Sequence, residues 1–244
     1  MSLSPFLPDG RPPGATPDPS ATDRLRTLIV TGVLAPASRV TEPEVAARLG
    51  VSRTPAREAM HQLQMEGLLV GDGGGARPRL AVAPLDAEEA RAVYEATGLL
   101  EGAGARTVAE WAAGDRRALA QELRRLDTAF RKVTRHRVFD PGTLFAAHHA
   151  FHVALVDATA DRVTRELLQV LSPRRMRYEW FHGPLLRMAG RPFAPTYDEH
   201  HAIVDAIADG TARDIEQVVR GNWSNAAQRL ADAILGARAV VGVR

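Results

Sequence analysis

The chain has 244 residues, of which 45% are hydrophobic and 25% charged, and its formal net charge is +2. This composition is typical of a globular protein with one or two domains. Because the chain has no cysteine, disulfides, thiolate zinc sites and cysteine nucleophiles are excluded. No apolar run approaches the length of a membrane span, and no signal-peptide pattern opens the chain. We therefore expect a cytoplasmic protein with no membrane partner.

The chain opens with a Pro- and Gly-rich segment, residues 1–20, that contains few apolar side chains. Such a segment buries too little surface to offset its ordering entropy, which predicts a disordered tail. The pattern then changes. Leu25 and Ile29 recur at helical spacing, and Gly32 and Pro36 follow as helix-ending residues. A first helix is predicted between the tail and these breaks.

Capping residues mark the next two helices. Thr41 and Glu44 have the spacing of a capping box at the start of a second helix over residues 42–49, and Gly50 ends it. Ser52 then begins a third helix, whose proline falls in the first turn, where a missing N–H costs little. The helix has an apolar inner stripe formed by Ala56, Ala59, Met60 and Leu63.

Two short extended stretches around a glycine-rich turn follow at residues 68–84, which predicts a small β-hairpin. Three short helices and a hairpin are the plan of a winged helix-turn-helix over residues 21–84. From residue 85 onward no strand pattern is visible, and residues 182–195 are predicted to be a loop. Helices are predicted over residues 86–112, 114–137, 141–158, 161–181, 196–208 and 211–236. The predicted fold class is therefore mainly α, with an all-helical bundle over residues 85–238.

Polar side chains crowd the start of the third helix. They occupy its first turn and a half: Ser52, Arg53, Thr54 and Arg57. A recognition helix presents this end to the major groove, where Arg can bond guanine and where Ser, Thr and helix N–H groups suit phosphates. Arg77 and Arg79, in the hairpin, are placed to reach the minor groove or the backbone. These residues predict binding to double-stranded DNA.

The segment GVSRTPAREAMHQLQMEGLL resembles the recognition region of the GntR family of bacterial regulators, G-V-S-R-x-P-V-R-x-A-L-x-x-L-x-x-x-G-L. The preceding GVLAPASRVTEPEVAARL is similar to the family's lead-in, with Ala37 where glycine is usual. The matching positions are Gly50, Val51, Ser52, Arg53, Pro55, Arg57, Ala59, Leu63, Gly67 and Leu68. The resemblance implies a regulator that binds a pseudo-palindromic operator, and we expect a homodimer because one winged helix reads only a half-site.

The helical half resembles the effector domain of the FadR subgroup of GntR regulators, often called the FCD domain. The segments VYEATGLLEGAGARTVA, AHHAFHVALVDATAD and DEHHAIVDAIADG carry this resemblance. It implies a small-molecule effector and, in many members, a divalent metal held by an Asp and three His. His152 and His200 match two of these His, His148 stands at the Asp position, and Asn222 aligns with the last His. Thr97 stands where the opening helix usually carries an Arg that helps bind effector carboxylates.

The residues themselves support part of this set. His148 and His152 are four positions apart, on one face of a helix, and His200 from another helix would complete a facial set of imidazoles. Such a set suits a divalent transition metal such as Zn or Ni. Alternatively, these His line a pocket or the surface without a metal. A basic cluster, Arg174, Arg175 and Arg177, is predicted to be a solvated helix face, the alternative being that one of them replaces the missing effector-binding Arg.

The sequence thus predicts a ligand-responsive, sequence-specific DNA-binding regulator, a repressor that a small molecule releases, and not an enzyme. The effector site is expected around Asn222 and Thr97. Two other readings stay open. One is a metal-dependent enzyme that uses His148, His152 and His200; the other is a nonspecific architectural DNA-binding protein.

Overall fold

The computed structural model describes residues 19–71, 79–136, 139–190 and 192–241. The chain divides into two compact units, one up to Leu85 and one from Asp86 onward. Most of the predicted disordered tail, residues 1–18, lies outside the described residues, as does Arg77 in the predicted wing. Within the described ranges, no helix is both long enough and apolar enough to cross a membrane.

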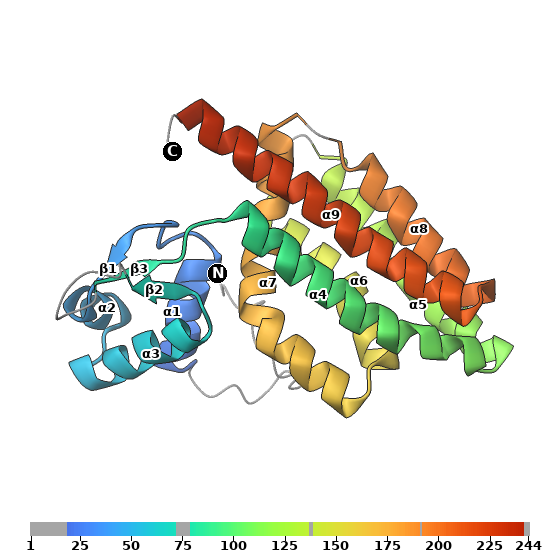
Figure 1. The fold of residues 1–244 in the computed structure, drawn as a ribbon, viewed down its shortest axis with the longest axis horizontal. Helices are drawn as coiled ribbons and strands as arrows, with labels where there is room; N and C mark the ends of the chain where they lie inside the picture. The colour runs from blue at the N-terminus through green and yellow to red at the C-terminus, as the bar shows by residue number, and fades with distance from the viewer. Residues whose placement is uncertain (1–18, 72–78, 137–138, 191, 242–244) are drawn as a thin grey trace. The chain divides into compact units, whose positions relative to one another are not determined.

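Short helices and an antiparallel sheet make up the described part of the first unit (Figure 1). The helices are α1 (Ala21–Val30), α2 (Glu42–Leu49) and α3 (Arg53–Met65). The strands are β1 (Arg39–Val40), β2 (Leu69–Gly71) and β3 (Leu80–Val82). They lie in the order β1-β3-β2, so that β2 and β3 form the predicted hairpin and β1 adds a strand to it. Strand β1 was not predicted, because two residues show no alternation.

Local signals in the sequence explain how α2 and α3 begin and end. The Thr41 N–H donates to Glu44 Oε2 at 3.1 Å, which confirms the capping box. Gly50 ends α2 with a φ of 65°, the left-handed conformation that glycine adopts at least cost. The inner stripe of α3 is buried as predicted: Ala56, Ala59, Met60 and Leu63. The polar side of α3 consequently faces solvent.

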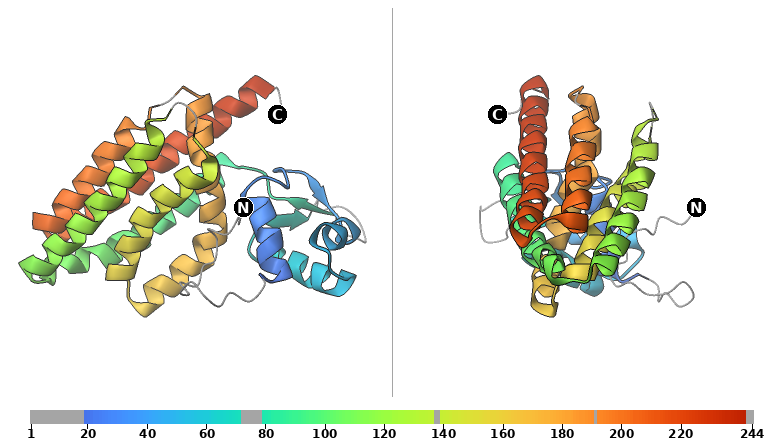
Figure 2. Two further views of the ribbon diagram at one scale, coloured as in Figure 1. Left: turned by 180° about the vertical axis from the view of Figure 1, so that it is seen from behind. Right: turned by 90° about the vertical axis from the view of Figure 1, so that its right-hand side faces the viewer.

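The described part of the second unit is helical. Its elements are α4 (Ala87–Ala105), a 3-10 turn (Arg106–Glu110), α5 (Ala113–Thr134), α6 (Pro141–Thr159), α7 (Arg162–Met188), α8 (Ala194–Asp209) and α9 (Ala212–Val241). Helix α4 packs along α9, and α5 packs against both α6 and α8 (Figures 1 and 2). The core of this unit therefore lies between the packed faces of these helices. The predicted fold class, a winged helix-turn-helix followed by a helical bundle, is confirmed.

The loop predicted over residues 182–195 was wrong in its first half. Helix α7 runs on to Met188, with Pro173 and Pro184 inside it, and α8 begins at Ala194. An internal proline removes one helical hydrogen bond, which is why the sequence suggested a break. The buried side chain of Leu186 and the close packing of Gly183 stabilise the helix beyond this point.

Candidate functional site

The predicted DNA-reading residues lie together at the exposed start of α3. Ser52 occupies the N-cap position, and Arg53, Thr54 and Arg57 follow on the solvent side. Arg57 donates from its Nε and Nη2 atoms to the Glu42 carboxylate at 2.9 and 3.1 Å. This ion pair was not predicted. Because its Arg57 side chain is 68% exposed, the pair is weak and easily exchanged for another anion.

Within the described ranges, the wing has one basic residue, Arg79. Arg79 is exposed and lies directly before β3. The basic side chains of the wing and of α3 therefore come from separate elements of one small unit.

Three imidazoles gather inside the second unit. His148 and His152 lie one turn apart on α6, and His200 lies on α8. One ring nitrogen of each lies within 4.8 Å of the others. Nitrogens bound to one zinc ion at about 2.0–2.1 Å are at most about 4.2 Å apart, so rings that lie at the 4.8 Å limit would move closer together around an ion. The structure thus brings the three predicted histidines together, and we refer to them as the imidazole cluster.

Two buried carboxylates orient this cluster. The Nδ1 atom of His152 donates to Glu101 Oε2 at 3.1 Å, and Nδ1 of His200 donates to Asp127 Oδ1 at 2.9 Å. An ionised carboxylate can only accept hydrogen bonds, so each Nδ1 carries the proton and each Nε2 keeps its lone pair. Carboxylate–imidazole pairs of this kind orient metal-binding histidines.

Further donors hold the two carboxylates in place. Trp223 Nε1 donates to Glu101 Oε2 at 2.7 Å, and Arg131 Nε donates to Asp127 Oδ2 at 2.6 Å. Burial alone would raise the pKa of Asp127, but its hydrogen bonds and ion pairs with His200 and Arg131 outweigh burial and lower that pKa. Sequence reasoning missed both carboxylates, although Glu101 is the one charged residue in the run ATGLLEGAGA of α4.

The imidazole cluster offers unpaired ring nitrogens of the kind that a metal requires. The Nε2 atoms of His152 and His200 are buried and have no hydrogen-bond partner within the described ranges. Leaving such an atom unpaired costs about 1–3 kcal/mol. Burial, with repulsion from the other two rings, holds the pKa of His148 well below its usual range. Burial also lowers the pKa of His200, despite its bond to Asp127. The residues therefore fit a divalent metal that prefers imidazole.

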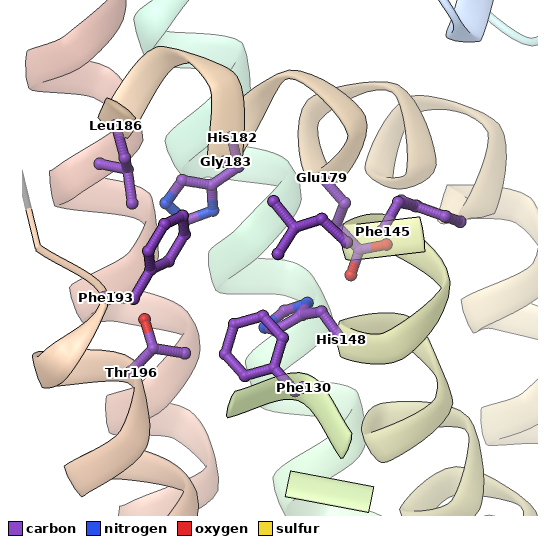
Figure 3. A pocket seen from close by; sticks show the side chains of 10 residues that line it. Phe130, Phe145, His148, Glu179, His182, Gly183, Leu186, Phe193 and Thr196 are labelled. Carbon is purple, nitrogen blue, oxygen red and sulfur yellow. The ribbon is translucent and has the colours of Figure 1, made fainter. Parts of the chain in front are cut away.

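A small cavity lies beside His148, one member of the cluster (Figure 3). Its volume is about 30 Å³, enough for about two water-sized groups. Its apolar wall comes from Phe130, Leu144, Phe145, Leu186 and Phe193. Its polar wall comes from His148, Glu179, His182 and Thr196. Because His148 belongs to both the cluster and the cavity wall, a group in this cavity would lie next to any ion held by the imidazoles.

Glu179 is the charged residue of the cavity wall. Arg175 Nη1 donates to Glu179 Oε1 at 3.1 Å, whereas Glu179 Oε2 is buried and lacks a hydrogen-bond partner among the described residues. His149 Nδ1 lies 3.4 Å from that oxygen without forming a hydrogen bond to it. Burial alone would raise the pKa of Glu179, but the charge of Arg175 and the interaction with His149 outweigh burial, so the pKa is strongly lowered.

The prediction that the basic cluster of α7 is a solvated face was wrong for two of its members. Arg175 is 8% exposed and Arg177 is 2% exposed, because α7 packs against α4 and α9 along this segment. Arg174 remains on the surface, with a side chain that is 40% exposed.

His182 also lies on α7. Burial lowers the pKa of His182 to about 3, and the positive charge of Arg229 acts in the same direction. His182 is therefore neutral where it lines the cavity.

The two remaining predicted effector residues are buried elsewhere. Thr97 is fully buried, and its hydroxyl donates to the Val93 carbonyl of its own helix at 2.8 Å. Asn222 is 4% exposed, and its Nδ2 donates to Glu199 Oε2 at 3.3 Å. Neither is among the described residues that line the cavity. Glu179 and His182, which do line it, were not predicted, since no spacing in α7 connects them to the histidines of α6 and α8.

Comparison with known proteins agrees with this architecture. The family model described as bacterial regulatory proteins, gntR family, matches residues 19–76, and the model of the FCD domain matches residues 92–224. A crystal structure of a GntR transcriptional regulator from Rhodococcus sp. RHA1 superposes with a TM-score of 0.59 at 24% identity, covering 88% of this chain and 96% of that one. McbR/YncC of E. coli superposes with a TM-score of 0.59 at 18% identity, covering 89% and 96%. These two likenesses show the fold.

A sequence relative points the same way. The HTH-type transcriptional regulator YdhC of Bacillus subtilis (strain 168) is 28% identical over 147 residues, which are 60% of this chain and 62% of that relative. The matched stretch thus spans less than two thirds of the relative. The family models cover both units of the chain, so the resemblance drawn from the sequence is confirmed. The chain belongs to the GntR family of bacterial regulatory proteins and carries an FCD domain.

Proposed function

We propose that this protein is a ligand-responsive transcriptional repressor that acts in the cytoplasm, where it binds an operator until a small molecule releases it. The observation that carries the proposal is the imidazole cluster. Two of its Nε2 atoms are oriented, buried and without a partner among the described residues. They lie beside a cavity in a chain whose other unit is a winged helix-turn-helix. A structural cluster would normally have paired these atoms.

On this proposal, the start of α3 enters the major groove. Arg53 and Arg57 contact base edges, and Ser52 and Thr54 bind phosphates, while Arg79 and Arg77 extend the contact from the wing. All four α3 residues are exposed on one end of the helix, which supports this assignment. The protein acts as a homodimer, because two half-sites related by a two-fold axis give the specificity that one short helix lacks.

The second unit supplies the response. His148, His152 and His200 would hold a divalent ion such as Zn or Ni, which as a Lewis acid would bind a donor atom of the effector. The cavity beside His148 holds the rest of the effector. Release of DNA then requires the effector to bind one arrangement of the protein more tightly than the other, since equal binding shifts no equilibrium.

The test combines metal analysis with DNA binding. Wild-type protein and a His152→Ala, His200→Ala double variant are purified in parallel, and their metal content is measured by elemental analysis. An operator is selected from random duplex DNA with the wild type. We expect metal in the wild type but not in the double variant, and a preferred pseudo-palindrome in the selection. His201→Ala is the matched control, because His201 is exposed and next to the cluster. Equal metal content in all three proteins would contradict the metal assignment, and selection without any preferred sequence would contradict the regulator assignment.

A further inference from the structure

We infer that the effector bound beside His148 presents a hydrogen-bond donor, a hydroxyl or an amine, to Glu179, and that it carries no second carboxylate at that end. The inference rests on the proposed function, whose site it uses. It concerns the chemical class of the ligand, which the buried oxygen of Glu179 and the charges around it determine.

Glu179 presents a buried oxygen that has no hydrogen-bond partner among the described residues. This oxygen is Oε2, and the residue is 7% exposed and lines the cavity. Figure 3 shows its carboxylate next to the His148 ring. Because an ionised carboxylate can only accept hydrogen bonds, a group that satisfies Oε2 from within the cavity must be a donor.

The surrounding charges argue against an anion at this end of the cavity. Arg175 already donates a hydrogen bond from Nη1 to the other oxygen of Glu179, Oε1. Arg229, the cation beside His182, is paired with both oxygens of Glu199 at 2.7 Å each. Burial lowers the pKa of His182 to about 3, so its ring adds no positive charge to the cavity wall. A carboxylate placed here would face the charge of Glu179 in a poorly screened interior, and Arg175 and Arg229 each already have a carboxylate partner.

The other residues of the cavity wall indicate a metal-binding end and an apolar stretch in the ligand. The imidazole cluster lies at the His148 side of the cavity, so a second polar end of the ligand would reach an ion there. Phe130 and Leu144 also line the cavity, which suits a short carbon chain. The effector class is therefore a small two-ended molecule: a metal-binding group, a short apolar stretch and a hydrogen-bond donor.

His149 offers the competing explanation. Its Nδ1 is also buried, has no hydrogen-bond partner in the described part of the chain, and lies 3.4 Å from Glu179 Oε2. A small rotation could therefore pair the two groups and satisfy that oxygen. In that case Glu179 would be a structural residue. The chemical group at the end of the ligand that faces Glu179 would then not affect how tightly the ligand binds. The two explanations differ in what they predict for ligands that change only at that end.

The test is calorimetry of the full chain, loaded with Zn²⁺, against four probes that share one carboxylate: propanoate, 3-hydroxypropanoate, 3-aminopropanoate and propanedioate. We expect the hydroxyl and amino probes to bind at least about tenfold more tightly than propanedioate, because a site built to bond a donor discriminates strongly against groups that cannot donate. In E179Q this preference shrinks, since the neutral amide no longer repels an anion.

Three results would overturn the inference: propanedioate binding as tightly as the hydroxyl probe, an undiminished preference in E179Q, or no binding by any of the four probes. The wild-type series stands without the variant, so misfolding of E179Q does not remove the test. Metal content and operator binding, measured without a probe on the same preparations, test the proposed function separately.

Discussion

Replacing Glu101 by Gln tests how the imidazole cluster is oriented. The Glu101 side chain is 1% exposed, and its Oε2 accepts hydrogen bonds from His152 and Trp223 at 3.1 and 2.7 Å. Gln has the same shape, and its oxygen can still accept both bonds. The substitution therefore removes the negative charge while leaving the packing in place, which isolates the electrostatic effect of the carboxylate on His152.

The expected magnitude follows from the role of such partners. A carboxylate behind a ligating histidine raises the basicity of the ring and fixes its orientation, and its loss costs about 10–100-fold in metal affinity. That range corresponds to about 1.4–2.7 kcal/mol of binding free energy. We expect the Asp127→Asn variant to show a loss in the same range, because Asp127 holds His200 in the same way at 2.9 Å.

The assay is competition for Zn²⁺ against a chromophoric chelator, with unfolding midpoints of the metal-free proteins as a check on the fold. Glu122→Gln is the control, since Glu122 has a side chain that is 46% exposed and is paired with Arg125 on the surface of α5. Zinc affinities of Glu101→Gln and Asp127→Asn that match the control would refute the reasoning, because the carboxylates would then not act through the cluster.

Three further predictions concern the scaffold and the DNA-binding surface. Arg53→Ala should weaken operator binding about ten- to hundredfold in a gel-shift assay at fixed salt, and unchanged affinity would remove Arg53 from the base contacts. Gly50→Ala should lower the free energy of unfolding in urea by about 1–2 kcal/mol, because of its φ of 65°; Gly114→Ala, with open space around its Cβ position, should not. Arg116→Gln should destabilise the protein by about 1–3 kcal/mol, because Arg116 donates to three carbonyls at the end of α8. The exposed Arg117 serves as its control, and equal unfolding midpoints for the two variants would contradict the last prediction.

Much of the fold was predictable because its signals are local. Thr41 and Glu44 are three positions apart and cap α2 as the pattern indicates, and Gly50 ends that helix. The prediction of a loop after residue 181 was wrong for a physical reason. A proline weakens a helix locally, but the tertiary packing that stabilises α7 around Pro184 comes from residues far away in the chain. Such compensation has no local pattern.

The site likewise contains residues that local spacing predicts and partners that only the fold brings together. His148 and His152 share a helix face, so their spacing was informative. Their partners were not visible, because Glu101 and Asp127 lie on α4 and α5, and no sequence pattern says which carboxylate meets which ring. The burial of Arg175 is a further example. A run of arginines usually marks a solvated face, and only the packing of α7 against its neighbours shows otherwise.

The helices that contribute to each part of the site suggest how a metal and an effector could have separate effects. The two carboxylate–imidazole pairs join α4 to α6 and α5 to α8. An ion held by the cluster would therefore tie these four helices together. Helix α7 contributes to neither pair, but Glu179 and His182 place it in the wall of the cavity. A ligand that bonds Glu179 would add α7 to the set that the ion already holds. Because an effector changes an equilibrium only through contacts that differ between the two states, the placement of α7 is the structural difference that effector binding could select.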